Sequence, residues 1–354
     1  MSDQLFPGVV AHSVTTPRLT AQVLERPAAG DPTAVVVFVH GNVSSSLFYQ
    51  PTMVALPDSV RALAVDLRGF GGSQTLPVDA TRGVRDFSDD VASVLDVLGL
   101  DRVHLVGWSM GGGVVMQLLL DHPDRVASLT LESPVSPYGF GGTTGADGRR
   151  LDELGAGTGG GGANPDFVAR LASGDTTADE QTSPRTVYRT AYVKNPDGLP
   201  HEDLWVAAML TTATGVDNYP GDAVACEPWP GFAAGGRGVL NTMAPTHFDT
   251  SGIVELGAKP PILWIHGADD AIVGDASFFD LNMLGKAGVI PGWPGDDVAP
   301  PQPMVTQTRA VLERYRDTGG VIREIEYADC GHSPHLERAD EFTAALAEWV
   351  ATAS

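Results

Sequence analysis

Short apolar runs recur along two parts of this chain and predict strands. Residues 34–39 (AVVVFV) form a continuous, largely β-branched run, which is the pattern of a strand that is buried on both faces. The weaker alternation at residues 19–25 also suggests a strand. Further runs with strand character occupy residues 61–65, 103–106, 126–131, 262–265 and 321–327.

Stretches with helical periodicity separate these runs. Apolar residues recur at spacings of three and four in one such stretch, which gives a single apolar stripe: Phe87, Val91, Val94, Leu95 and Leu98. Gly99 ends this helix. Other helices are predicted at residues 111–120, 304–315 and 342–350. Strands that alternate with helices of this length predict an α/β fold with a doubly wound, mostly parallel sheet.

The pattern changes after Glu132. Residues 134–257 are rich in Gly, Pro, Thr and Asp and have few long apolar runs, although helical patches occur at 167–172 and 203–212. The run GAGTGGGG at 155–162 predicts a flexible loop. We interpret residues 134–257 as a cap inserted into a core made of residues 1–133 and 258–354. A second irregular insertion is expected at 275–303.

One turn carries the pattern of a nucleophile. The sequence GWSMGG at 107–112 contains the form G-x-S-x-G, and it lies between a predicted strand and a predicted helix. A serine at such a turn occupies a strained backbone with its hydroxyl raised from the sheet edge. Ser109 is therefore the candidate nucleophile. The backbone N–H of Met110 begins the helix and is a candidate donor to an oxyanion.

A serine hydroxyl needs a base, and the base needs an orienting acid. Groups at the carboxyl ends of parallel strands meet in one crevice, so residues that follow strands are the candidates. His332 follows the last strand and Asp270 follows the strand before it, which gives the chain order Ser, Asp, His. Three alternatives stay open: His335 as the base, and Asp269 or Glu132 as the acid. A second oxyanion donor is expected from the loop after residues 34–39, where the backbone N–H of Asn42 is the candidate.

The motifs HGN, DLRGFGGS, GWSMGG, HGADDAIV and GHSPH resemble those of α/β-hydrolase-fold enzymes. The branch includes haloperoxidase-like esterases, epoxide hydrolases, haloalkane dehalogenases and carbon–carbon bond hydrolases. The resemblance covers residues 30–133 and 258–352 and implies a serine hydrolase acting on an ester or lactone. Dehalogenases and epoxide hydrolases of this branch carry aspartate where this chain has Ser109. The sequence HGNVSSS at 40–46 resembles a loop of the dehalogenases, and this resemblance makes the Asn42 side chain a candidate for substrate contact.

Candidate substrate contacts elsewhere are less specific. Asn42 and Trp108 flank the predicted site along the chain, and Trp205 and Met209 belong to the predicted cap. Trp205 and Met209 fit either a pocket lining or ordinary cap core, and core is the favoured interpretation. His40 and His266 precede glycines at strand ends and are interpreted as structural.

Composition restricts the classes of partner. The formal charge of −22 argues against binding of nucleic acid or an anionic membrane. No run of 18 apolar residues and no signal-peptide pattern is present, and two cysteines do not make a disulfide framework, so a cytoplasmic protein is expected. No zinc spacing or phosphate loop is found, and we predict neither cofactor nor metal. The expected partner is a small-molecule ester or lactone substrate of small to medium size. Carbon–carbon bond hydrolysis, perhydrolysis and a slow ligand receptor on the same fold remain alternatives, and no oligomeric state is predicted.

Overall fold

The structure is a computed structural model that describes residues 4–353, and its centre is one eight-stranded sheet. The order across the sheet is β1-β2-β4-β3-β5-β6-β13-β14. The strands span β1 (Val10–Thr15), β2 (Thr20–Arg26), β3 (Ala34–Val39), β4 (Val60–Val65), β5 (Val103–Trp108), β6 (Val126–Glu132), β13 (Ile262–Gly267) and β14 (Ile322–Tyr327).

The sheet is mostly parallel, as the alternation of strands and helices predicts. Only the pairings of β1 with β2 and of β2 with β4 are antiparallel. Strand β5 lies between β3 and β6, and every residue of β5 and β6 is buried. Strand β1 was not predicted from the sequence, because its residues (VAHSVT) are mostly exposed at the sheet edge and form no continuous apolar run.

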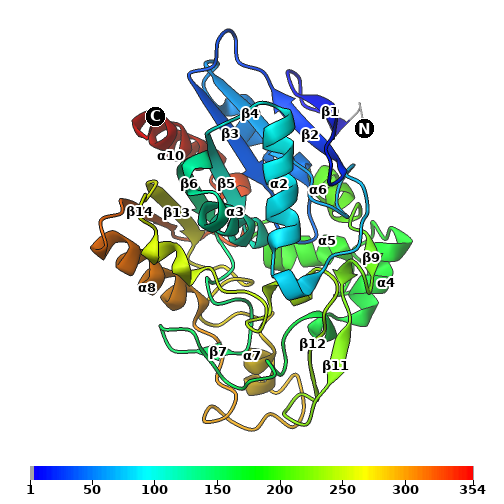
Figure 1. The fold of residues 1–354 in the computed structure, drawn as a ribbon. Helices are drawn as coiled ribbons and strands as arrows, with labels where there is room; N and C mark the ends of the chain where they lie inside the picture. The colour runs from blue at the N-terminus through cyan, green and yellow to red at the C-terminus, as the bar shows by residue number, and fades with distance from the viewer. Residues whose placement is uncertain (1–3, 354) are drawn as a thin grey trace.

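Helices cover both faces of this sheet. Helix α2 packs on α3, and α1 packs on α10. Figure 1 shows α2 and α3 in front of the sheet. The helices span α1 (Gln50–Ala55), α2 (Arg85–Val97), α3 (Met110–Asp121), α4 (Pro165–Ser173), α5 (Pro184–Val187), α6 (Glu202–Met209), α7 (Leu281–Lys286), α8 (Met304–Asp317), α9 (Pro334–Glu337) and α10 (Ala339–Thr352). No helix within residues 4–353 is both long and apolar enough to cross a membrane.

The chain between β6 and β13 contributes no strand to the main sheet within the described residues. It holds α4, α5 and α6, a π-helical turn η6 (Tyr188–Tyr192), and short strands in two-stranded sheets. These strands are β7 (Thr143–Thr144), β8 (Arg149–Arg150), β9 (Thr214–Gly215), β10 (Tyr219–Pro220), β11 (Ala223–Ala225) and β12 (Phe232–Ala234). Figure 1 places β7, β11 and β12 below the sheet, together with α7 of the second insertion. The division into core and cap stays our interpretation.

The glycine-rich run at 155–162 is packed more closely than a loose loop. A Cβ atom at Gly159 would lie 2.1 Å from Asn241 Oδ1, and one at Gly161 would lie 2.4 Å from the ring of Phe232. The N–H of Gly160 donates to the same Asn241 oxygen at 2.8 Å. Glycine is required here because neighbouring chain segments occupy the space of a side chain, so the prediction of a flexible loop missed the main role of this run.

Candidate active site

Ser109 lies at the junction of β5 and α3 in a strained backbone. Its φ and ψ angles are 57° and −121°, a conformation that non-glycine residues rarely adopt. The Ser109 N–H donates to the carbonyl of Glu132 at 2.9 Å, and its own carbonyl accepts from Val135 at 3.0 Å. The neighbouring strand and the start of the cap therefore hold the turn in place.

Two glycines make this turn possible. A Cβ at Gly107 would lie 2.3 Å from the carbonyl oxygen of Gly111, and a Cβ at Gly111 would lie 2.2 Å from that of Val39. Both distances are far below van der Waals contact. The G-x-S-x-G pattern thus reflects close packing of α3 against β5 and β3.

His332 and Asp270 meet across two loops. Nδ1 of His332 lies 2.8 Å from Oδ2 of Asp270, and both side chains are only 2% exposed. The other Asp270 oxygen accepts the N–H groups of Ile272 and Val273 at 2.8 and 2.9 Å, which fixes the carboxylate. Because Nδ1 donates to the carboxylate, Nε2 of the neutral ring is left as the basic nitrogen.

The rival acids and base have other partners. Asp269 points outward, is 40% exposed and pairs with Lys194 at 3.2 Å. Glu132 and His335 are fully buried and pair with each other, with 2.6 Å between Oε1 and Nδ1. The geometry therefore joins His332 to Asp270 rather than to Asp269 or Glu132.

The loop after β3 lies against the elbow. A Cβ at Gly41 would lie 2.9 Å from Cβ of Ser109. Among residues 4–353, neither the N–H of Asn42 nor that of Met110 donates to a protein acceptor. The side-chain oxygen of Asn42 is also buried without a partner. Unpaired donors beside a strained serine are the arrangement that an oxyanion hole requires.

His40 has a structural place in this loop. Its Nε2 accepts the N–H of Leu67 at 3.0 Å, so Nδ1 carries the proton and donates to the carbonyl of Gly41 at 2.7 Å. Complete burial lowers the pKa of His40, which keeps the ring neutral.

A cavity of about 360 Å³ opens above Ser109. Ser109, His332, Asn42 and Trp108 line it together with mostly apolar side chains. Among the described residues, no hydrogen bond joins the Ser109 hydroxyl to the His332 ring. Such bonds are commonly long before a substrate binds and shorten in the complex.

Trp205 and Met209 do not line this cavity. They are 1% and 0% exposed, and the ring centroid of Trp205 lies 5.0 Å from that of Phe48. The structure therefore does not bring these two residues to the cavity, and their burial fits the favoured interpretation as core residues. The physical reason is that α6 faces the core rather than the cavity.

Comparison with known proteins agrees with this architecture. A family model described as the alpha/beta hydrolase fold matches residues 34–152. A putative aryl esterase from Burkholderia cenocepacia superposes with a TM-score of 0.58 at 19% identity, covering 97% of this chain and 99% of that one. The carboxylesterase CesB (YbfK) from Bacillus subtilis superposes with a TM-score of 0.57 at 17% identity, over 98% and 93% of the two chains. The chain has the α/β-hydrolase fold.

The relatives found by sequence align with a smaller part of this α/β-hydrolase-fold protein than the solved structures do. A putative carbamate hydrolase RutD from Variovorax paradoxus is 42% identical over 106 residues, which are 30% of this chain and 38% of that protein. The carboxylesterase YbfK from Bacillus subtilis is 32% identical over 103 residues, or 29% and 34% of the two chains. The chain thus matches little more than a third of the length of these curated relatives.

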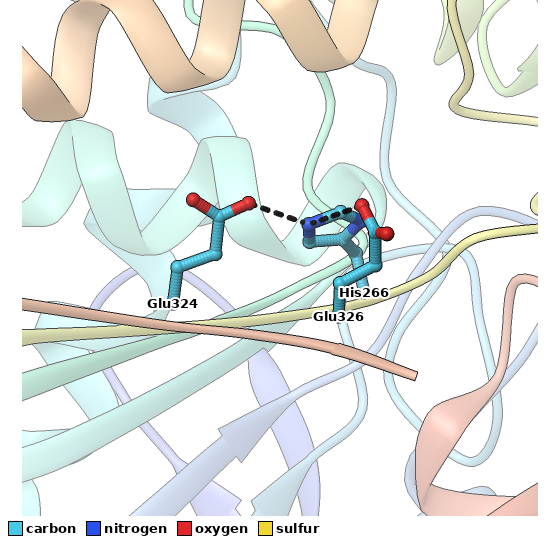
Figure 2. A group of neighbouring side chains, drawn as sticks. All are labelled: His266, Glu324 and Glu326. Atoms are coloured by element: carbon cyan, nitrogen blue, oxygen red, sulfur yellow. Dashed lines mark hydrogen bonds and ion pairs between the residues drawn. The ribbon is translucent and has the colours of Figure 1, made fainter. Parts of the chain in front are cut away.

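Away from the cavity, one group of neighbouring side chains consists of residue types that can bind a metal ion. Figure 2 shows His266 of β13 between Glu324 and Glu326 of β14, with the three ligand atoms within 4.8 Å of one another. Nε2 of His266 lies 3.0 Å from Glu324, but Nη2 of Arg309 lies 2.6 Å from the same carboxylate oxygen. Because Arg309 of α8 already supplies a cation there, we assign the cluster to packing of α8 on the sheet.

Several cavity residues could not be found from the sequence. Phe140, Phe167, Tyr192 and Phe279 line the cavity, and all four lie in residues 134–257 or in the second insertion. Phe140 and Phe279 lie outside helices and strands, whereas Phe167 lies in α4 and Tyr192 ends η6. The sequence does not show which side of these short segments faces the cavity. Asp280 differs from these aromatic residues because it adds a carboxylate to the lining. The carboxylate is buried, and burial raises its pKa to about 6.

Proposed function

We propose that this protein is a serine hydrolase that cleaves a small to medium, partly apolar ester or lactone through an acyl-serine intermediate. The observation that carries this proposal is the pairing of His332 with Asp270 at the cavity that Ser109 also lines. A strained serine, a base with one free nitrogen and a buried acid are the three parts of a catalytic triad.

The residues would act as follows. Oγ of Ser109 attacks the substrate carbonyl carbon while its proton passes to Nε2 of His332. Asp270 stabilises the imidazolium that forms. His332 then gives the proton to the leaving oxygen, so the alcohol departs and the acyl group stays on Ser109. A water molecule then loses a proton to His332 and attacks the acyl carbon. The bond from that carbon to Oγ of Ser109 breaks, His332 returns the proton to Oγ, and the acid is released.

The negative charge of the tetrahedral intermediate needs fixed donors. The N–H groups of Met110 and Asn42 would supply them, because no protein acceptor within residues 4–353 takes these donors. Loss of one such donor typically raises the barrier by about 3 kcal/mol, so the pair would contribute much of the rate.

The cavity supports a modest, partly apolar substrate. Its lining is mainly aliphatic and aromatic, and it is formed by the catalytic loops, the cap and the second insertion. The names of the relatives and of the structural neighbours, carbamate hydrolase, carboxylesterase and aryl esterase, describe hydrolysis at a carbonyl carbon.

Hydrolysis of p-nitrophenyl butyrate by the Ser109→Ala variant tests the proposal. Ser133→Ala is a matched control, because Ser133 follows β6 and its buried hydroxyl has no partner. We expect Ser109→Ala to lose activity by at least about 10³-fold while Ser133→Ala stays within a few fold. Undiminished turnover by Ser109→Ala would reject Ser109 as nucleophile.

The alternatives predict different results in the same assay. A slow ligand receptor would form the acyl-serine and release it slowly, so a burst of p-nitrophenol would be followed by almost no turnover. Carbon–carbon bond hydrolysis or perhydrolysis with the same residues would depend on Ser109 as well, but would give poor ester turnover and would be found by assaying those reactions directly.

A further inference from the structure

One segment of the cap contacts both loops that carry the proposed catalytic groups. Residues 192–195, which we name the cap strap, begin at the last residue of the π-helical turn η6. The hydroxyl of Tyr192 donates to the carbonyls of Asn42 and Val43, with 3.0 Å to each oxygen. Within residues 4–353 it is the only donor that these two carbonyls have.

The loop that Tyr192 holds is strained. Val43 has a φ of 46°, a left-handed conformation that is unfavourable for a β-branched residue. Such strain persists only where surrounding contacts fix it. The peptide between Asn42 and Val43 is next to the Asn42 N–H, so a partner for its carbonyl also fixes the direction of that N–H.

The same strap is joined to the histidine loop. One carboxylate oxygen of Glu337 accepts the N–H of Gly331 at 2.7 Å, and the other accepts those of Lys194 and Asn195 at 2.8 and 3.1 Å. The contact is close, because a Cβ at Gly331 would lie 2.8 Å from the nitrogen of Lys194. Gly331 immediately precedes His332, so Glu337 ties the strap to the proposed base.

Tyr192 also packs against the site itself. Its ring meets Trp108 and His332 edge-on, with centroids 5.7 and 6.2 Å apart. The ring is 6% exposed and lines the cavity. Burial raises the pKa of its hydroxyl, which therefore stays protonated and able to donate.

We propose that the cap strap is a positioning device and that Tyr192 is the positioning residue for the oxyanion-hole loop. This inference rests on the proposed serine hydrolase function. The hydroxyl of Tyr192 keeps the Asn42 N–H aimed at the position where the oxyanion forms. Glu337 holds the loop that carries His332 against the same strap. The cap then sets catalytic competence as well as cavity shape.

The variant Tyr192→Phe tests this role. It removes the hydroxyl but keeps the ring, and the Asn42–Val43 peptide loses its partner. We expect kcat for p-nitrophenyl butyrate to fall by roughly tenfold to a hundredfold with KM within about twofold, since a displaced donor weakens the transition state more than the bound substrate. The Ki of a trifluoromethyl ketone, whose adduct with serine carries an oxyanion, should rise by a similar factor.

Tyr188→Phe is the matched control. Tyr188 begins the same π-helical turn, is fully buried, and has a hydroxyl without a partner. Its substitution should leave kcat and the ketone Ki within about twofold. Equal effects of the two variants, an effect of Tyr192→Phe on KM alone, or no effect of it would overturn the inference.

Two further measurements separate the possible failures. If Tyr192→Phe does not fold, Glu337→Gln tests the strap from its other end, and a fall in kcat without a change in KM is again expected. If the unmodified protein neither turns over esters nor reacts at Ser109, the proposed function has failed. If it does both and Tyr192→Phe matches it, the positioning role alone is rejected.

Discussion

At the scale of single residues, the direction in which a side chain points identifies the acid of the proposed triad, whereas its position along the chain does not. Asp269 and Asp270 are adjacent, yet Asp269 faces solvent and Lys194 while Asp270 faces His332. The sequence pattern favours Asp270 but leaves Asp269 and Glu132 open, because the path of a loop depends on hydrogen bonds that a sequence does not reveal. The N–H groups of Ile272 and Val273 provide that information here.

The adjacent pair gives a direct comparison. Asp270→Asn removes the charge that orients His332, and kcat for an activated ester should fall by about 10³- to 10⁴-fold. Asp269→Asn removes a half-exposed surface charge and should change kcat by less than about twofold. Steady-state kinetics of both variants check this expectation. Equal losses, or a larger loss for Asp269→Asn, would contradict the assignment.

At the scale of elements, the sequence predicts those strands and helices whose apolar residues follow a regular pattern. The strands β3, β5, β6 and β13 and the helices α2 and α3 are found close to their predicted bounds. The short helix α7 was missed within the second insertion, because six residues do not complete two turns of an apolar stripe. Its start is visible only in the structure, where Asp280 caps it by accepting the N–H of Asn282 at 3.0 Å.

Asp280 makes the stability of this element depend on pH. Burial raises its folded-state pKa to about 6 from an ordinary 3.8, and the N–H groups of Asn282 and Gln302 offset part of this shift. As pH rises from about 4 to 6, the unfolded chain releases this proton while the folded protein keeps it. The contribution of Asp280 therefore destabilises the fold across that window, by about 3 kcal/mol in total.

Urea unfolding at pH 4.5 and pH 7 measures this effect. Asp280→Asn cannot ionise. Between pH 4.5 and pH 7 the unfolding free energy of the unmodified protein should therefore fall by about 2 kcal/mol relative to that of the variant. The comparison uses the change with pH, so a constant cost of the substitution cancels. The same pH dependence in both proteins would show that Asp280 titrates normally.

At the scale of the whole molecule, three separate stretches of chain enclose the cavity. The loops that carry the proposed triad end the sheet strands. The segment that we interpret as a cap supplies side chains such as Phe140 and Tyr192, and the second insertion supplies Phe278 and Phe279. The arrangement of the sheet follows from the pattern of its strands. The walls of the cavity cannot be predicted from such a pattern. The cap and the second insertion pack through irregular segments and through close glycine contacts such as those of Gly159.

This enclosure predicts a limit on substrate size. A cavity of about 360 Å³ suits a short or medium acyl chain but not a long one. We expect kcat/KM for p-nitrophenyl butyrate to exceed that for p-nitrophenyl palmitate by at least about tenfold, measured in detergent below its critical micelle concentration. A preference for palmitate would mean that the cap and second insertion do not bound the acyl site.

Covalent labelling shows whether Ser109, His332 and Asp270 work as one unit, as we propose. The protein and its Ser109→Ala and His332→Ala variants are treated with a fluorophosphonate, and the modified peptide is identified by mass spectrometry. We expect rapid, single modification of Ser109, none of the Ser109→Ala variant, and labelling of His332→Ala that is slower by at least about 10³-fold. Failure to label Ser109, or an equal labelling rate without His332, would contradict it.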